Sequence, residues 1–189
     1  MQVREAIEQR RAYRSFDPVE ITDDLIRDFA EVAQIAPSCF NKQPWRYIFV
    51  RNKDTLQELF TILSDTNKWI EKCSMMIAVF SKPELDCIIK ERNYYLFDTG
   101  LATAFIVLRA TELGLVAHPI AGFNEKEGKE ILGIPEEMRL ITFVIIGKHS
   151  DKINPVLSEN MKLGEKQRPP RKDISDFAYL DKYGKSFEK

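Results

Sequence analysis

The chain has 189 residues, 44% of them hydrophobic and 30% charged, which favours one domain of a globular protein. Its formal net charge of -1 gives no overall attraction to nucleic acid or to an anionic membrane, and no apolar run could serve as a signal peptide or cross a bilayer. The three cysteines lack short paired spacings and the two histidines are far apart, so we expect reduced thiols, no bound metal and a cytoplasmic location.

The N-terminal half alternates patterns typical of helices and strands. The elements expected there are a helix over 1–11, a helix over 23–35, a strand over 45–50, a helix over 54–63 and a strand over 75–80. Thr22 is a suitable N-cap for the second helix, and Pro37 ends it because proline disfavours helical geometry in the residue before it. The strand over 75–80 is apolar throughout, which is typical of a strand covered on both faces.

The C-terminal half continues the alternation and ends in a tail. The elements expected there are a long helix over 84–113, a strand and turn over 115–123, a helix capped by Asn124 and Gly133, and a strand over 139–147. The long helix is apolar nearly all round from Leu96 to Leu108, so we place that part at the centre of the fold or in a subunit interface. Residues from about 150 to 189 show little periodicity and form a functional, disordered or docked tail.

These elements predict one domain, 1–189, in which an α/β or α+β sheet is covered on both faces. The apolar helix and the unanchored tail suggest a homodimer whose tails embrace the partner subunit. The sequence has no glycine-rich dinucleotide or phosphate loop, no nucleophile elbow and no metalloprotease motif. If the protein is an enzyme, a bound cofactor therefore carries the difficult chemistry.

Three polar segments remain after the core is assigned. Arg10, Arg11 and Arg14 form either a solvated helix end or a phosphate-binding group. The rigid loop "PSCFNKQPW" either satisfies its own backbone or reads the edge of a heterocycle through its amides. The tail segment "KQRPPRKD" is either a disordered basic linker or a second set of cations for the same anion. Together they would suit a heterocycle that carries a phosphate.

The same segments resemble the signatures of the FMN-dependent nitroreductase family. "RRAYRSF" is similar to its N-terminal motif, "PSCFNKQPW" to its Pro-Ser-Ser-x-Asn-x-Gln-Pro-Trp motif, "PIAGF" to its Pro-Ile-x-Gly-Phe turn and "KQRPP" to its C-terminal Lys-x-Arg-x-Pro. Their order and spacing hold along almost the whole chain. The resemblance implies an α+β fold with a central mixed, mainly antiparallel sheet flanked by helices, and a homodimer that exchanges its C-terminal extensions.

The resemblance also implies FMN as cofactor and ping-pong hydride transfer from NADH or NADPH to a small acceptor such as a nitroaromatic or a quinone. Arg10, Lys166 and Arg168 would hold the phosphate of FMN, Arg11 the phosphate or ribityl chain, and Arg14 the pyrimidine edge, where its charge stabilises reduced flavin. No side chain would act as a catalytic acid. The remaining positions of the implied site are Ala12, Pro37, Ser38, Cys39, Asn41, Ala121 and Gly122, of which Pro37 to Asn41 would reach the flavin from the partner subunit.

Three positions depart from the family pattern, since Ala12 and Cys39 replace serines and Ala121 replaces a frequent acidic residue. The chain also lacks the long insertion that shapes the substrate pocket in larger members, so the acceptor stays open. Two alternatives remain: a different reduction on the same scaffold, such as dehalogenation or enone reduction, or a flavin-binding or storage protein without useful turnover. We expect no nucleic-acid or membrane partner.

Overall fold

The computed structural model describes residues 1–186, and its centre is a five-stranded sheet. The strands are β1 (Phe16–Asp17), β2 (Arg46–Val50), β3 (Met75–Ser81), β6 (Leu115–Ile120) and β7 (Arg139–His149). Their order is β1-β7-β3-β2, with β6 also paired to β7. All these described pairings are antiparallel. The predicted α+β architecture with a mainly antiparallel sheet is therefore confirmed, although the described strands include no parallel pair.

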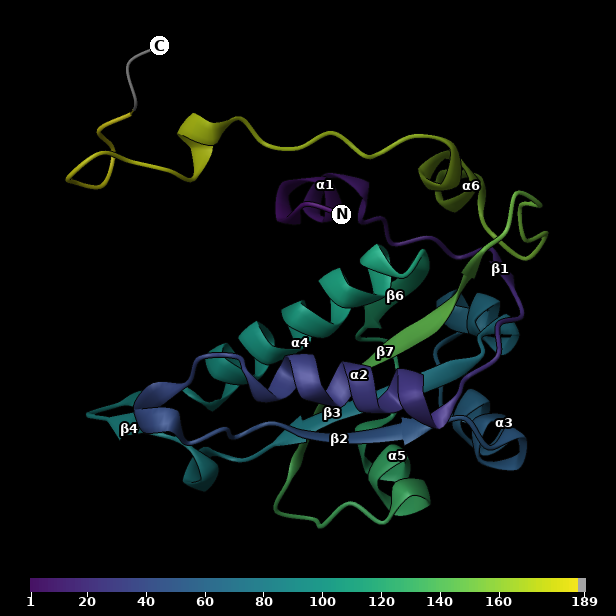
Figure 1. Cartoon of the computed structure of the whole chain (residues 1–189), viewed down its shortest axis with the longest axis horizontal. Helices are drawn as coiled ribbons and strands as arrows, with labels where there is room; N and C mark the ends of the chain where they lie inside the picture. Colours follow the sequence, from purple (N-terminus) through teal and green to yellow (C-terminus); the bar gives the residue numbers. More distant parts are fainter. Residues whose placement is uncertain (187–189) are drawn as a thin grey trace.

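Helices cover both faces of this sheet (Figure 1). The α-helices are α1 (Val3–Gln9), α2 (Asp23–Gln34), α3 (Lys53–Thr61), α4 (Tyr95–Glu112), α5 (Glu125–Leu132) and α6 (Glu159–Lys166). Short 3-10 helices are η1 (Cys39–Asn41), η2 (Asp65–Lys72), η3 (Pro83–Leu85) and η4 (Ile174–Asp176). Among residues 1–186, no helix has the length and apolarity needed to cross a bilayer.

The expected caps set the helix boundaries. Oγ1 of Thr22 accepts the N–H of Leu25 at 3.2 Å at the start of α2, and Oδ1 of Asn124 accepts the N–H of Glu127 at 3.3 Å at the start of α5. Gly133 ends α5 with φ of 64°, a left-handed conformation that glycine adopts without steric cost.

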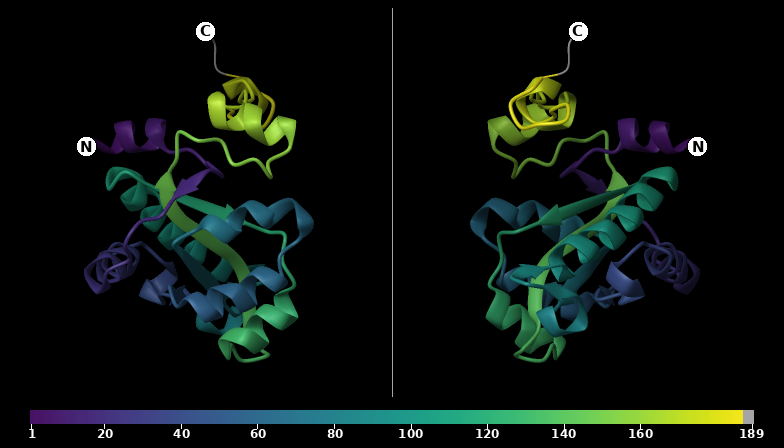
Figure 2. Two further views of the ribbon diagram at one scale, coloured as in Figure 1. Left: turned by 90° about the vertical axis from the view of Figure 1, so that its right-hand side faces the viewer. Right: turned by 90° about the vertical axis from the view of Figure 1, so that its left-hand side faces the viewer.

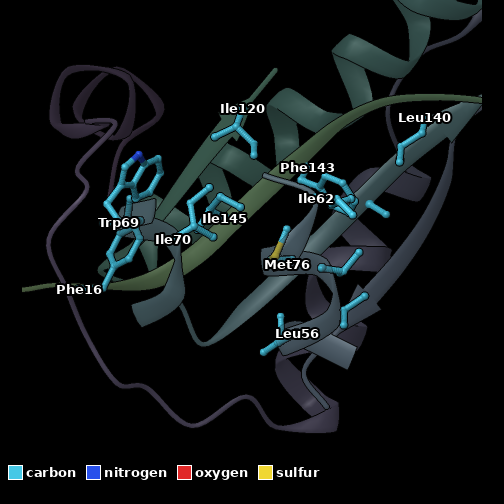
Figure 3. Close-up of a cluster of buried hydrophobic side chains, with 14 of the residues drawn as sticks. Phe16, Leu56, Ile62, Trp69, Ile70, Met76, Ile120, Leu140, Phe143 and Ile145 are labelled. Atoms are coloured by element: carbon cyan, nitrogen blue, oxygen red, sulfur yellow. The ribbon is translucent and has the colours of Figure 1, made fainter. Parts of the chain in front are cut away.

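The core consists of two layers, one on each face of the sheet. Side chains alternate along β3, so that Met76, Ala78 and Phe80 face one layer and the residues between them face the other. Figure 3 shows the first layer, in which Leu56 of α3 and Trp69 and Ile70 of η2 contribute to the cluster. The second layer lies under α2 and α4. The apolar run is therefore covered on both faces, as the sequence predicts.

The prediction of one helix over 84–113 is wrong in its first third. A 3-10 turn and a small hairpin, β4 (Ile88–Ile89) with β5 (Arg92–Asn93), precede α4, which begins only at Tyr95. The β-branched side chains of β4 favour an extended backbone, and Lys90 has φ of 58°, which a helix cannot contain. Residues 84–94 contain neither Gly nor Pro, so the hairpin forms without the residues that usually interrupt a helix.

The C-terminal tail is more ordered than its sequence suggests. Residues 159–166 form α6, whose start is capped by Ser158, and the segment after it runs over α1 and away from the sheet (Figures 1 and 2). Ile174, Phe177 and Tyr183 of this segment are exposed. The single-domain assignment for 1–189 remains a prediction, and its last three residues lie outside the described part.

Candidate functional site

A pocket of about 190 Å³ lies where the end of α1 meets the segment that follows α6. It is lined by residues from both ends of the chain: Arg10, Arg11, Ala12, Arg14, Gly164, Arg168, Pro169 and Arg171. These residues meet because Arg168, just after α6, donates to main-chain oxygens at the end of α1, and Arg11 donates to the main-chain oxygen of Gly164. We call this the arginine pocket.

Arg10, Arg168 and Arg171 concentrate positive charge in this pocket. Partial burial and the charges of Arg168, Arg171 and Arg11 lower the pKa of Arg10 from its usual value. Within residues 1–186 no ion pair joins Arg10, Arg168 or Arg171 to a carboxylate. Nη2 of Arg168 donates instead to the main-chain oxygens of Glu8 and Arg10, at 2.5 and 2.9 Å. Forked cations without protein counter-charges are suited to a phosphate.

Arg11 and Arg14 also have structural partners. Nη2 of Arg11 donates to the main-chain oxygen of Gly164 at 2.7 Å. Burial lowers the pKa of Arg14, and the nearby Glu165 carboxylate partly offsets this. Glu165 is itself buried and accepts the main-chain N–H groups of Arg14 and Ser15, at 2.8 and 3.1 Å. These bonds hold the end of α6 against the basic turn and fix the shape of the pocket.

An apolar groove of about 490 Å³ adjoins the arginine pocket, because Arg10 lines both. Apart from Arg10, its lining comes from α4 and the sheet: Val79, Leu96, Thr99, Gly100, Thr103, Ala104, Val107, Leu108, Pro119, Ile141 and Thr142. Oγ1 of Thr99 is buried and has no hydrogen-bond partner in the described part of the chain. A groove of this size with a cation at its rim is suited to a flat, largely apolar ligand that carries an anionic group.

The turn after β6 borders a further hollow of about 520 Å³, which shares Leu96 and Ile141 with the groove and includes Ala121. The next residue, Gly122, accepts the N–H of Ser64 at its main-chain oxygen, at 3.0 Å. A Cβ at Gly122 would collide with Oγ of Ser64, so this close approach requires glycine. Ala121 therefore lines a hollow that adjoins the groove, whereas Gly122 packs against Ser64.

The loop Pro37–Asn41 lies beside β4, at the opposite end of the molecule from α6 (Figure 1). Oγ of Ser38 accepts the N–H of Gln43 at 3.0 Å, and Nε2 of Gln43 donates to Oδ1 of Asn41 at 3.0 Å. Phe40, Asn41 and Gln43 have φ of 46°, 56° and 49°, a region that residues other than glycine seldom occupy. The polar side chains thus brace a strained loop, and Phe40 at its tip is exposed.

Cys39 of this loop forms a disulfide with Cys87, and their Cα atoms are 6.1 Å apart. The prediction of reduced thiols is therefore wrong for these two residues, while Cys73 is free. The sequence could not show this pair, because its members are 48 positions apart and meet only when the loop packs beside the hairpin. Burial raises the pKa of the Cys73 thiol to about 12, so it is not a reactive thiolate.

His118 on β6 is a buried titratable group behind the turn that carries Arg10 and Arg14. Its Nδ1 lies 3.0 Å from the main-chain oxygen of Tyr13, so this nitrogen carries a proton and donates it. Burial lowers the pKa of His118 to about 4, the bond to Tyr13 opposes this shift, and Arg14 and Arg10 add to it. A neutral imidazole at this position supports the turn that carries the arginines.

The structure thus gathers part of the expected site. Five of the named residues lie together in the arginine pocket: Arg10, Arg11, Ala12, Arg14 and Arg168. Lys166 does not, because it borders a separate hollow with His149 and Ser150. Arg171 also lines the pocket; it lies in the basic run "KQRPPRKD" but is not among the site residues that the sequence predicts.

Fold and pocket together define an α+β protein with an anion-binding pocket at the rim of an apolar groove. The sequence profile of the Nitroreductase family matches residues 7–91 and 66–148. A protein of Archaeoglobus fulgidus named "Putative NADH dehydrogenase/NAD(P)H nitroreductase" is 29% identical over 150 residues, which cover 76% of this chain and 83% of the relative. The chain belongs to the nitroreductase family.

Solved structures agree with this assignment. A nitroreductase family protein from Clostridium novyi is 28% identical, with a TM-score of 0.75 over 99% of this chain and 97% of its own. A protein of Clostridium difficile described as an FMN-dependent nitroreductase is 19% identical, with a TM-score of 0.71 over 94% of this chain and 98% of its own. The second similarity shows the fold alone.

Proposed function

We propose that the protein is an FMN-dependent NAD(P)H oxidoreductase. The observation that carries this proposal is the arginine pocket, in which cations without carboxylate partners stand at the rim of an apolar groove. Family relatives named as NAD(P)H nitroreductases support the electron donor, and a structural neighbour described as FMN-dependent supports the cofactor.

The residues present fit FMN. Arg10, Arg168 and Arg171 would bind its phosphate, since several guanidinium groups can match a dianion through forked hydrogen bonds. The adjoining groove of about 490 Å³, whose lining is mostly apolar, would take the isoalloxazine ring. Lys166 is a weaker candidate than the sequence suggests, because it borders another hollow.

When bound, FMN would accept a hydride from NADH or NADPH and pass the electrons to a small acceptor such as a nitroaromatic or a quinone. The protein's part is to bind, orient and balance charge. Arg14 lines the arginine pocket and not the groove, so its place at the pyrimidine edge of the flavin, where its permanent charge would favour reduced flavin, remains a prediction. Hydride transfer requires no side-chain acid, and His118, which is buried and hydrogen-bonded to the backbone, is not placed to act as one.

We also propose that the active form is a homodimer. The loop Pro37–Asn41 is too remote from the arginine pocket to complete the site within one chain (Figure 1). In a dimer, Pro37, Ser38, Cys39 and Asn41 would approach the flavin held by the partner subunit. Exposed apolar side chains on α1, α4 and the tail, such as Ile7, Phe97 and Phe177, offer surface that such a dimer would bury.

Titration of the cofactor-free protein with FMN tests the proposal. We expect about one FMN per chain, held more weakly at high salt because the charge pairing is screened. Arg168→Ala should weaken binding by roughly tenfold or more, as expected for a lost hydrogen bond between charged groups. Arg4→Ala is the matched control, since Arg4 is exposed on α1 and pairs with Glu8.

Two results would count against the proposal. A wild-type protein that takes up no FMN would remove the cofactor assignment. Bound FMN that neither NADH nor NADPH reduces would instead indicate a flavin-binding or storage protein.

A further inference from the structure

A second cluster of reactive groups lies at the base of the hairpin, away from the arginine pocket. Cys39 comes from the loop after α2, Asp86 and Cys87 lie just before β4, and Asp98 lies in the first turn of α4. One ligand atom each from Cys39, Asp86 and Cys87 lies within 4.8 Å of the other two. The N–H of Cys39 donates to Oδ2 of Asp98 at 2.6 Å, and the N–H of Cys87 donates to Oδ1 of Asp86 at 2.7 Å.

One carboxylate oxygen of Asp86 is buried without a hydrogen-bond partner in the described part of the chain. Its side chain is 9% exposed, and among residues 1–186 its Oδ2 has no hydrogen-bond donor. The neighbouring acidic group is the carboxyl of Asp98, which is also buried. A buried acceptor that faces no donor is the kind of atom that a metal ion satisfies.

We propose that Cys39, Cys87 and Asp86 form a binding site for a thiophilic divalent cation of the Zn²⁺ type when their disulfide is reduced. Two thiolates and one carboxylate are ligands that Zn²⁺ accepts, at about 2.3 Å from sulfur and 2.0–2.2 Å from oxygen. A tetrahedral ion with such bonds spaces its ligand atoms by roughly 3.5–4 Å, which the observed cluster permits. The fourth position is open to water, since both cysteines are only half-buried.

The backbone is suited to both states of Cys39 and Cys87, the disulfide and the pair of zinc-bound thiolates. A Cα separation of 6.1 Å lies in the range of disulfides, and small rotations about χ1 would part the sulfurs enough to admit an ion. Asp98 is a positioning residue here, because its carboxylate holds the N–H of Cys39 and so aims this side chain. Both states tie the strained loop of Phe40 and Asn41 to the hairpin.

The chemistry balances in two steps. A dithiol reductant gives two electrons and two protons to the disulfide, which becomes two thiols while the reductant becomes a cyclic disulfide. Zn²⁺ then replaces the proton of each thiol, so that two protons leave for solvent as two Zn–S bonds form. A small-molecule disulfide would drive the return step: it takes two electrons from the two thiolates and, with two protons from solvent, becomes two thiols, while Cys39 and Cys87 form their disulfide and release Zn²⁺.

Equilibrium dialysis against Zn²⁺ tests this site in the full chain without FMN. The protein is reduced with a phosphine, freed of reductant without air, and its bound zinc is measured against that of the oxidised protein. We expect about one Zn²⁺ per reduced chain and none per oxidised chain. Cys39→Ser and Cys87→Ser should each weaken binding at least a hundredfold, and Asp86→Asn about tenfold. Cys73→Ser is the matched control and should bind zinc like wild type.

A readout on the unaltered protein guards against variants that fail to fold. Zinc should protect Cys39 and Cys87 of the reduced wild type from alkylation, as mapped by mass spectrometry of peptides. Reduced protein that binds no more zinc than oxidised protein, or zinc that leaves both cysteines open to alkylation, would overturn the site. Unchanged affinity in Asp86→Asn would overturn the role of its carboxylate. These outcomes do not involve flavin, so they leave the proposed oxidoreductase function untouched.

Discussion

Arg10, Arg168 and Arg171 place like charges together without carboxylate partners in the described chain, an arrangement that disfavours the folded state in the absence of an anion. Arg171→Ala should therefore leave the urea midpoint of unfolding of the cofactor-free protein unchanged or slightly raised. The same substitution should weaken FMN binding by roughly tenfold, because a charged hydrogen bond to phosphate is lost. A lowered midpoint with unchanged FMN affinity would show a structural role for Arg171 instead.

His118 gives the protein a specific dependence of stability on pH. Its folded-state pKa of about 4 lies below the ordinary value of 6.5, so the unfolded chain takes up a proton first as pH falls. His118 makes its full contribution to the free energy of unfolding above about pH 6.5, and this contribution is lost progressively as the pH falls towards 4. Between about pH 7 and pH 5 this loss is roughly 2 kcal/mol.

Urea unfolding of wild type and His118→Gln at about pH 7 and pH 5 measures this contribution. Protonation of carboxylates lowers the stability of both proteins at the lower pH. The difference between their losses of stability therefore measures the contribution of His118. The variant should lose less stability on acidification than the wild type. Equal losses in the two proteins would show that the imidazole is protonated in the folded state.

Among individual residues, the sequence predicted the charged residues of the arginine pocket but not the cysteine pair, which depends on the fold. Arg10, Arg14 and Arg168 stand in basic runs with a recognisable order, so they could be named before the structure. Arg171 stands in the same run and was overlooked. Cys39 and Cys87 could not be paired, because they are 48 positions apart and meet only where the loop after α2 packs beside the hairpin.

Among the elements, α6 depends on one buried carboxylate. Glu165 accepts the main-chain N–H groups of Arg14 and Ser15 and so joins the end of α6 to the basic turn. Glu165→Gln should lower the free energy of unfolding by about 1–3 kcal/mol, since a neutral amide offers one acceptor oxygen for two donors. Glu159→Gln is the control, because Glu159 is exposed at the start of the same helix.

Chemical denaturation of wild type, Glu165→Gln and Glu159→Gln compares their free energies of unfolding. FMN titration of the same three proteins shows whether the arginine pocket still binds its ligand. We expect Glu165→Gln to weaken FMN binding as well, because the turn that carries Arg10 and Arg14 loses its anchor. A variant as stable as Glu159→Gln would contradict the anchoring role of Glu165.

The loop after α2 and the hairpin before α4 act as one unit because the disulfide joins them. In protein handled in air, native alkylation should label none of the cysteines, since Cys39 and Cys87 are paired and the Cys73 thiol is buried. Mild reduction should add label at Cys39 and Cys87, while Cys73 should react only after denaturation. Peptide mapping that finds label on Cys39 before reduction would contradict the pairing.

Elements with a strong local signal were predicted well, and those defined by tertiary contacts were not. The N-caps Thr22 and Asn124, the buried strand β3 and the helix boundary before Pro37 followed from short-range physics. The helix predicted before Tyr95 was wrong, because the β-branched pair Ile88 and Ile89 favours an extended backbone and Lys90 turns the chain with a positive φ. The order of strands in the sheet lay beyond any pattern in the sequence.

For the whole molecule, the central question is how two ends of one chain make a complete site. The arginine pocket lies at one end and the loop Pro37–Asn41 at the other, and the segment after α6 leaves the body with apolar side chains exposed. Our proposal joins these observations by a homodimer in which each flavin contacts both subunits. The family and the α+β fold were predictable from four ordered motifs, whereas the exchange of tails remains a prediction.

Removal of residues 172–189 tests this assembly. The truncated chain keeps Arg168 and Arg171 but loses Ile174, Phe177 and Tyr183, which are exposed in the single chain. Light scattering should show a shift from dimer towards monomer, and FMN should be held more weakly although the arginines are intact. A truncated chain that is still fully dimeric and holds FMN normally would show that the tail has no part in assembly.

The central claim is that this chain uses bound FMN to pass electrons from NADH or NADPH to a small acceptor. Its most direct test is an anaerobic titration of the FMN-loaded protein with each nucleotide, followed through the visible absorption of the flavin. We expect about one equivalent of NADH or NADPH to bleach the flavin, and a nitroaromatic or a quinone added afterwards to restore its colour. A protein that holds no FMN, or whose bound FMN stays oxidised with both nucleotides, would contradict the claim.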